Sequence, residues 1–299
     1  MRTNQVQTTG DEGDKQQHIN GIIKTLWLRP NIQYLPFDLP VTFRRSDIGR
    51  FHQEQHYVSS KLNGERHYLL CCKYKEQLFI VFVKRNGSYT FTNVAQTSWP
   101  ALFNGTLLDV EIIHSNVIAF DCIAYNGMSL VDVPFIHRLQ HLQSTVQELQ
   151  QHTSVTVKQW VILSSAVDLN RLMHSTKNSD GLVFVPCCGT LIKKPFSFKW
   201  KPLHTVDLGV SSDRQLWTHS KNVPVATSTI HFTTCVNLPK TFTGIAEFSL
   251  SFRDGEWVPS FIQPRYDKLM PNEIDVVHQT LINIQENVNL NELQYVLCD

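Results

Sequence analysis

Ser60-Lys61-Leu62-Asn63-Gly64-Glu65-Arg66 is the stretch that decides the fold of this 299-residue chain. Its central feature is a lysine followed by a glycine turn. An amine attacks phosphorus only in its neutral form, and the ordinary pKa of lysine is about 10.4. A nucleophilic Lys61 therefore needs partial burial and cationic neighbours, such as Arg66, Lys199 and Lys201, to lower that pKa. Taken alone, the stretch is more typical of a surface lysine before a turn.

Further segments follow Lys61 in a fixed order along the chain. They are Leu108-Asp109-Val110-Glu111, Phe120-Asp121, Ser179-Asp180-Gly181-Leu182-Val183-Phe184, Phe198-Lys199-Trp200-Lys201-Pro202 and Arg265-Tyr266-Asp267-Lys268. Each segment has a structural explanation when it is taken alone. Their joint occurrence in this order favours a nucleophilic lysine over a surface lysine.

Two of these segments offer oxygen ligands to a metal ion, and one offers a pair of cations. Mg²⁺ and Mn²⁺ prefer hard oxygen ligands, which Glu111 and Asp180 supply. The alternatives are a solvated strand carboxylate at Glu111 and a turn residue at Asp180. Lys199 and Lys201 are two residues apart on a predicted strand, so both should point to one face. They repel each other unless an anion such as a triphosphate lies between them; the alternative is a solvated edge strand.

The composition is that of an ordinary globular protein without a strong charge. The formal net charge is +1, whereas dedicated duplex-DNA-binding proteins usually carry a basic surplus. No run of about 18 apolar residues is present to span a membrane. Residues 1–20 are polar and lack the apolar core of a signal peptide, which predicts a disordered tail. The odd number of cysteines, seven, then indicates reduced thiols in an intracellular protein.

Strand-like runs separated by turn signals predict a mixed α+β fold. Asn86-Gly87 and Asp254-Gly255 are expected hairpin turns. In the first part of the chain we expect strands at 67–73, 78–84, 89–93, 106–114, 116–124, 155–163 and 182–186. Apolar residues at helical spacing predict helices at 134–152, 167–174 and 272–288. From about residue 206 a small β-barrel such as an OB-fold is expected, with strands at 216–219, 228–236, 244–252 and 256–263.

The segments, in this order, resemble those of the covalent lysyl-nucleotidyltransferases, the superfamily of ATP-dependent DNA ligases, RNA ligases and mRNA-capping guanylyltransferases. The resemblance runs from about Leu35 to Val288 and is greatest to the capping guanylyltransferases. It rests on the runs Leu39-Pro40-Val41-Thr42-Phe43-Arg44-Arg45, Phe120-Asp121-Cys122-Ile123-Ala124-Tyr125-Asn126-Gly127, Phe198-Lys199-Trp200-Lys201-Pro202, Thr205-Val206-Asp207 and Pro271-Asn272. It implies a nucleotidyltransferase domain of mixed antiparallel sheets and helices, ATP-grasp-like as in ligases and capping enzymes, at residues 21–205. An OB-fold domain with a C-terminal helix would occupy residues 206–299.

The resemblance also implies a role for each candidate residue. Lys61 is the nucleophile, and Glu111 and Asp180 hold Mg²⁺ or Mn²⁺. The remaining catalytic residues act on the phosphates and on the leaving pyrophosphate: Lys199, Lys201, Arg265, Asp267 and Lys268. The nucleotide-binding residues, of which Phe120 stacks on the purine, are Gly64, Arg66, Phe120 and Asp207.

Two positions depart from the pattern of the family. Asn63 stands where most capping enzymes and DNA ligases have Asp, and Val110 replaces a usual Gly. We expect Asn63 to alter ribose or metal contacts and Val110 to crowd the strand beside the nucleotide. Neither change removes a group that performs chemistry.

The implied reaction has two half-reactions. Lys61 attacks the α-phosphate of GTP, releases pyrophosphate and keeps GMP through a phosphoramidate bond, and the GMP then passes to the 5′-diphosphate end of RNA. The alternatives are an ATP-dependent polynucleotide ligase, for RNA or DNA, that forms lysyl-AMP, and a catalytically inactive scaffold of the same fold. An RNA triphosphatase and a cap methyltransferase are expected as partners in trans, with RNA polymerase a further candidate and no membrane involved. The expected location is the nucleus for a cellular protein, and the cytoplasm or the virus particle for a viral one.

Overall fold

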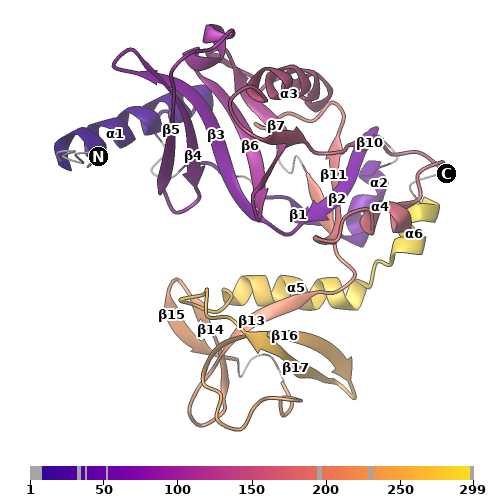
Figure 1. Cartoon of the computed structure of the whole chain (residues 1–299). Helices are drawn as coiled ribbons and strands as arrows, with labels where there is room; N and C mark the ends of the chain where they lie inside the picture. Colours follow the sequence, from indigo (N-terminus) through magenta and orange to yellow (C-terminus); the bar gives the residue numbers. More distant parts are fainter. Residues whose placement is uncertain are drawn as a thin grey trace. The chain divides into compact units, whose positions relative to one another are not determined.

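The computed structural model describes residues 9–31, 35–37, 39–51, 53–193, 197–227, 230 and 232–296. The chain divides into two compact units (Figure 1). The first unit consists of Met1–Val41, Gly49–Trp200 and Leu297–Asp299, and the second of Thr42–Ile48 and Lys201–Val296. The main boundary therefore falls after Trp200. Each unit is described separately below.

The largest sheet of the first unit is antiparallel except at one edge. Its strands lie in the order β5-β4-β3-β6-β7-β8, and β9 pairs in parallel with β7. The bounds are β3 Glu65–Tyr74, β4 Gln77–Lys84, β5 Tyr89–Val94, β6 Thr106–Ile113, β7 Asn116–Tyr125, β8 Met128–Ser129 and β9 Val155–Val157. The hairpin predicted at Asn86-Gly87 is confirmed, and Gly87 has the positive φ that this turn requires.

A helix covers each face of this sheet (Figure 1). Successive residues of β3 alternate between the two faces, so that Leu69 and Cys71 share a core cluster with α3, Phe135–Leu149. Leu70 and Cys72 belong to the opposite cluster, which contains α1, Thr9–Leu26. The apolar spacing between residues 134 and 152 thus predicted α3 correctly.

The prediction of a disordered tail over residues 1–20 is wrong for residues 9–20, which form the first part of α1. Ile19, Ile23 and Leu26 lie on one face of this helix, and all three are buried against the sheet. Tertiary burial of this short apolar stripe stabilises a helix whose other residues are mainly polar. Residues 1–8 lie outside the described residues.

A second sheet of the first unit carries the nucleophile candidate. Its strand order is β1-β12-β11-β2-β10. The bounds are β1 Val41–Thr42, β2 His56–Leu62, β10 Val161–Ile162, β11 Ser179–Pro186 and β12 Phe198–Trp200. The first unit also has the short helices η2 Pro100–Asn104 and α4 Leu169–Met173 and most of α2, Ile48–Phe51, whereas η1, Arg45–Asp47, belongs to the second unit.

The prediction of a single strand at residues 155–163 is wrong, because this stretch forms two short strands, β9 and β10. β9 pairs with β7 in the first sheet, whereas β10 pairs with β2 in the second. Lys158, Gln159 and Trp160 therefore carry the chain from one sheet to the other. The local pattern does not distinguish one long strand from two short strands with different partners.

The described residues of the second unit form one sheet, the α-helices α5 and α6 and the short helix η1. Its strands lie in the order β15-β14-β13-β16-β17. The bounds are β13 Thr205–Val210, β14 Leu216–Ser220, β15 Val223–Ala226, β16 Gly244–Arg253, β17 Glu256–Pro264, α5 Ile274–Glu286 and α6 Leu290–Val296. Helix α5 confirms the helix predicted at 272–288, and it buries Val277 and Leu281 against the sheet. Gly209 allows the Trp217 ring to pack across β13, because a Cβ atom there would lie 2.0 Å from that ring.

The strand predicted at 228–236 is not found among the described residues. Residues 228, 229 and 231 lie outside them, and Phe232 and Val236 form only isolated bridges to β17. Within the described part of the second unit, β15 and β17 are the two edges of an open sheet. The predicted hairpin at Asp254-Gly255 is confirmed between β16 and β17, and both of its residues have positive φ.

Two further sequence-based expectations concern the whole chain. The six cysteines in the described residues are free thiols, and four of them are buried. No helix in the described ranges is long and apolar enough to cross a bilayer.

Candidate active site

The first unit contains a cavity of about 250 Å³. Both of its sheets contribute to the lining. The side chains that carry charge or π-faces into it include those of Lys61, Arg66, Glu111, Phe120, Lys158 and Trp160. The cavity thus brings together Lys61, Glu111 and Phe120, which lie in three different sequence motifs.

Lys61 lies near the end of β2 and faces a carboxylate. Its Nζ donates to Asp180 Oδ1 at 2.7 Å, across 119 residues of sequence. The contact is possible because β2 pairs with β11, and a bulge follows Ser179 in that pairing. The side chain of Lys61 is 19% exposed and that of Asp180 is 31% exposed. Because the amine donates to this carboxylate, it has to leave the contact before it acts as a nucleophile.

Gly64, three residues after Lys61, occupies a position where only glycine fits. A Cβ atom at Gly64 would lie 2.7 Å from the Ile112 carbonyl oxygen and 2.8 Å from Glu111 Cγ. The Gly64 amide donates to Glu111 Oε1 at 2.8 Å. The glycine therefore lets the turn after Lys61 lie directly against β6, where Glu111 holds it.

Arg66 extends from β3 into the cavity and is held by a buried carboxylate. Its Nε donates to Asp109 Oδ1 at 2.8 Å, and its Nη2 contacts Asp109 Oδ2. Burial raises the pKa of Asp109 to about 6, although the charge and hydrogen bonds of Arg66 act in the opposite direction. The Arg66 guanidinium lies 5.4 Å from the centre of the Phe120 ring. The sequence placed Asp109 in a motif but gave it no role.

Phe120 presents its ring to the cavity from a β-bulge. On β7, Asp121 pairs with Asp109 and Ala119 pairs with Val110, which leaves Phe120 as the extra residue. A bulge re-aims a side chain relative to the regular alternation of a strand. The Phe120 carbonyl accepts a hydrogen bond from Trp160 Nε1 at 3.3 Å.

Lys158 and Trp160 are cavity residues that sequence reasoning missed. Lys158 Nζ lies 5.8 Å from the centre of the Phe120 ring and 5.1 Å from that of Trp160. Burial lowers the pKa of Lys158 to about 8; Glu111 opposes this shift, and the charges of Lys61 and Arg66 add to it. The available signal was a lysine within the strand-like run 155–163, because lysine is rarely buried without a partner.

Glu111 and Asp180 are compatible with a divalent cation. Glu111 lines the cavity, and Asp180 contacts Lys61, which lines it too. Two carboxylates form the hard-oxygen donor set that Mg²⁺ uses when substrate phosphates and water complete its coordination. No group of three or more His, Cys, Asp or Glu side chains within the described ranges is arranged to hold a metal without such help.

Lys199 and Lys201 do not share one strand. β12 ends at Trp200, so Lys201 follows the strand and is the first residue of the main part of the second unit. Lys199 pairs with Val183 on β11, between the buried side chains of Phe198 and Trp200. Burial alternates along β12, but the prediction that both lysines lie on one face of that strand is wrong for Lys201, and the described lining of the cavity includes neither lysine.

The remaining predicted residues form a charged cluster on the second unit. Arg265 Nη1 donates to Asp207 Oδ1 at 2.8 Å, and its Nε and Nη2 donate to Asp267 at 3.0 and 2.9 Å. Lys268 Nζ lies 4.0 Å from Asp207 Oδ2. Hydrogen bonds from Arg265 lower the pKa of Asp267 to about 2. Burial raises the pKa of Asp207, against the opposing charges of Arg265 and Lys268.

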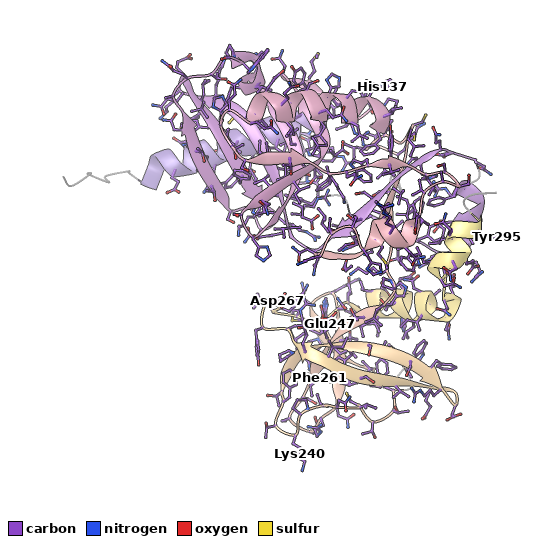
Figure 2. All side chains as sticks on the ribbon, turned by 45° about the vertical axis from the view of Figure 1, so that its right-hand side comes forward. His137, Lys240, Glu247, Phe261, Asp267 and Tyr295 are labelled. Carbon is purple, nitrogen blue, oxygen red and sulfur yellow. The ribbon has the colours of Figure 1, made fainter. Side chains whose placement is uncertain are left out.

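Glu247 is a further member of this cluster that the sequence did not indicate. It lies on β16, and its Oε2 is 3.9 Å from Arg265 Nη1. Although burial alone would raise its pKa, hydrogen bonds from Gln263 and Thr205 and the charges of Arg265 and Lys201 lower it. Figure 2 labels Glu247 and Asp267 on the second unit.

The two departures from the family pattern lie in different environments. Val110 is fully buried in the core cluster that contains α3. Phe135 and Val185 belong to the same core cluster and line the cavity, so the expectation that Val110 crowds the strand beside the nucleotide stays a prediction. Asn63 is exposed, and its backbone N–H donates to the backbone carbonyl of Asn178 at 2.8 Å.

Comparison with known proteins gives consistent similarities. The chain is similar to mRNA-capping enzyme subunit alpha of Saccharomyces cerevisiae, with 23% identity over 88% of this chain and 78% of that protein. It is also similar to mRNA-capping enzyme subunit alpha of Candida glabrata, with 26% identity over 56% of this chain and 46% of that protein.

Among solved structures, the ATP-dependent DNA ligase of bacteriophage T7 in complex with ATP matches with 16% identity and a TM-score of 0.42, over 78% of this chain and 82% of that chain. The ligase domain of M. tuberculosis LigD matches with 15% identity and a TM-score of 0.36, over 78% and 97%. A family model described as the catalytic domain of mRNA capping enzymes matches residues 1–203. Because that match includes more than half of the 299 residues of this chain, the chain belongs to the mRNA capping enzyme family.

Proposed function

We propose that this chain is an mRNA guanylyltransferase that acts through a covalent lysyl-GMP intermediate. The observation that carries the proposal is the position of Lys61 Nζ, 2.7 Å from Asp180 Oδ1, on a cavity whose other walls bear Arg66, Phe120 and Lys158. A nucleophile, a cation for phosphate or ribose, a π-face and a buried donor are the groups that covalent transfer of a purine nucleotide requires. Membership of the capping family supports the same chemistry.

In the first half-reaction, neutral Lys61 forms a bond from Nζ to the α-phosphorus of GTP. The bond between that phosphorus and the oxygen leading to the β-phosphate breaks, and pyrophosphate leaves. In the second half-reaction, a terminal oxygen of 5′-diphosphate RNA attacks the same phosphorus, and Lys61 leaves as the amine. Transfer of this kind depends mainly on positioning and on neutralisation of charge.

Mg²⁺ or Mn²⁺, held by Glu111 and Asp180, would neutralise charge on the triphosphate. Glu111 also fixes the turn at Gly64 through its 2.8 Å hydrogen bond, which keeps Lys61 on the cavity wall. Asp180 holds the Lys61 amine in place by accepting its hydrogen bond at 2.7 Å. These two carboxylates therefore have roles in both the metal site and the position of the nucleophile.

We assign the choice of guanine over adenine to Lys158. Its ammonium group is only a donor of hydrogen bonds, and it lies beside the Phe120 ring, on which the purine would stack. Guanine presents the O6 acceptor at the position where adenine presents an amino donor. A donor-only group at this position favours GTP and disfavours the ATP-dependent ligase that we retain as the alternative.

The second unit is proposed to complete the active site. We assign residues 206–299 to an OB-fold domain and residues 21–205 to the nucleotidyltransferase domain. Arg265, Asp267 and Lys268 would orient the leaving pyrophosphate, with Asp207 and Glu247 holding Arg265 in position. Lys199 and Lys201 would contact the phosphates once the nucleotide is bound.

The reaction requires two further activities, which we assign to partner proteins. An RNA triphosphatase must supply the 5′-diphosphate end, and a methyltransferase must complete the cap. RNA polymerase is a candidate platform for all three, which would place the reaction in the nucleus of a cell or in the cytoplasm or particle of a virus.

The test is incubation with α-labelled GTP or ATP and Mg²⁺ or Mn²⁺, followed by denaturing electrophoresis. A labelled GMP adduct that is acid-labile, stable in base and lost in Lys61→Ala is expected. Lys61→Arg should also give no adduct, because arginine stays protonated. An AMP adduct would instead indicate the ligase, and the absence of any adduct would indicate an inactive scaffold.

A further inference from the structure

Arg138 is a buried cation on α3 that none of the preceding assignments uses. Its side chain is 0% exposed and forms a bidentate ion pair with Asp121. Nε donates to Asp121 Oδ1 at 2.8 Å, and Nη2 donates to Asp121 Oδ2 at 2.9 Å. Nη1 donates to the carbonyls of Val133 at 2.7 Å and Gly189 at 3.0 Å. One guanidinium thus joins the start of its own helix to β7 and to the segment at Gly189.

The carboxylate that Arg138 holds is next to the bulged residue Phe120. Asp121 Oδ1 also accepts a hydrogen bond from the backbone N–H of Cys122 at 2.8 Å, so the carboxylate is bound to its own strand as well. Phe120 is one of the two extra residues in the β6–β7 pairing, and Ile123 is the other. The bulge is therefore fixed on one side by the Asp121–Arg138 pair and on the other by Trp160, which donates to the Phe120 carbonyl.

The energetics indicate that geometry rather than stability is the reason for this pair. The desolvation of two buried charges often cancels their attraction, and a well-packed apolar pair commonly serves stability as well. A two-pronged Arg–carboxylate contact instead fixes distance and orientation. Asp121 and Phe120 both line the cavity, so the geometry that Arg138 fixes is that of the cavity wall.

We propose that Arg138 is a positioning residue that acts through Asp121 to hold the Phe120 ring against the purine base of the nucleotide. The inference rests on the proposed function, in which Phe120 stacks on the base. It predicts that loss of the two hydrogen bonds from Arg138 to Asp121 weakens nucleotide binding at Phe120. The maximal rate of lysyl-GMP formation at Lys61 should change little.

The experiment is a double-mutant cycle on the full chain with Phe120→Ala, Arg138→Lys and the combination. Single-turnover formation of lysyl-GMP is measured against GTP concentration, at a temperature where circular dichroism shows each variant folded. Phe120→Ala and Arg138→Lys should each raise the half-saturating GTP concentration roughly tenfold, since base stacking on an aromatic ring has about this effect. Maximal rates should stay within about threefold of wild type. The combined variant should resemble Phe120→Ala alone within about twofold, because both changes remove one interaction.

Thr145→Val is the matched control. Thr145 is buried on the same helix, and its Oγ1 has no hydrogen-bond partner among the described residues. The control should leave the melting temperature unchanged or raise it slightly, because it removes a buried unpaired hydroxyl, and it should not change the half-saturating GTP concentration. Should Arg138→Lys fail to fold, Asp121→Asn keeps the shape of the side chain and one acceptor oxygen, and it enters the same cycle.

Two results would overturn the inference, and they can be told apart. If the effects of Phe120→Ala and Arg138→Lys multiply, Arg138 acts independently of the ring, and the inference fails while the proposed function stands. If Phe120→Ala leaves the half-saturating GTP concentration unchanged, the stacking role in the proposed function fails as well.

Discussion

Lys61 Nζ and Asp180 Oδ1 are 2.7 Å apart, although 119 residues separate them in sequence. The pairing of β2 with β11 brings them together. In this arrangement the nucleophile candidate donates a hydrogen bond to one of the two carboxylates assigned to the metal. Binding of the cation by Asp180 and release of the lysine are therefore expected to be coupled.

The metal carboxylates give the first prediction. Glu111→Ala and Asp180→Ala should each lower the rate of lysyl-GMP formation more than about a hundredfold, because each removes a key electrostatic group from the transition state. The rate is measured with labelled GTP across a series of Mg²⁺ concentrations. Glu12→Ala, on the exposed surface of α1, is the control and should behave as wild type. Near-normal rates in both variants would show that these carboxylates are only structural.

Base selection by Lys158 gives the second prediction. Lys158→Gln introduces an acceptor beside Phe120, so the preference for GTP over ATP should fall about tenfold or more; a hydrogen bond from a charged donor contributes about 1.5–3 kcal/mol. The measurement is the ratio of kcat/KM for lysyl-GMP and lysyl-AMP formation. Lys158→Arg keeps a donor-only side chain and should retain more of the preference. An unchanged ratio in Lys158→Gln would remove Lys158 from base selection.

The raised pKa of Asp109 gives the third prediction, on stability. Its pKa is about 6 in the folded chain against an ordinary 3.8, so between these pH values the folded state binds more protons than the unfolded state. Asp109 therefore makes the free energy of unfolding fall as pH rises from about 4 to about 6. The charged groups that act on it are Arg66, Asp121 and Glu111.

Denaturant unfolding of wild type and Asp109→Asn over pH 4–7 checks this sign. The free energy of unfolding of wild type relative to the variant should decrease by up to about 3 kcal/mol across the window. This follows because the pKa of Asp109 is about 6 in the folded chain and 3.8 ordinarily. A relative stability that rises with pH would mean that Arg66 overcomes the burial of the carboxylate.

The charged cluster of the second unit gives the fourth prediction. Arg265→Ala and Lys268→Ala should block formation of lysyl-GMP, since these cations are assigned to the leaving pyrophosphate. Lysyl-GMP that is formed first, and then cut at a protease site inserted after Trp200, should still transfer GMP to diphosphate-ended RNA. Arg253→Ala, at the exposed end of β16, is the control. Full adduct formation in Arg265→Ala would leave the second unit without a role in the first half-reaction.

Local elements were predictable because their causes lie within a few residues. Asn86-Gly87 and Asp254-Gly255 are turns for which positive φ is inexpensive, and both occur where expected. Helices α3 and α5 follow from apolar spacing. The family was also predictable, because the order of short motifs along a chain is a property of sequence alone.

The sequence by itself thus determined the hairpin turns, the amphipathic helices α3 and α5, the order of the motifs and the family. Only the tertiary structure decided which residues meet. Lys158 lies where the chain crosses from the sheet of β9 to the sheet of β10, and Arg138 reaches Asp121 from a helix. It also decided that α1 is a helix, through burial of Ile19, Ile23 and Leu26. The physical reason is that strand pairing, ion pairs and burial depend on partners distant in sequence, whereas turns and amphipathic spacing are written into neighbouring residues.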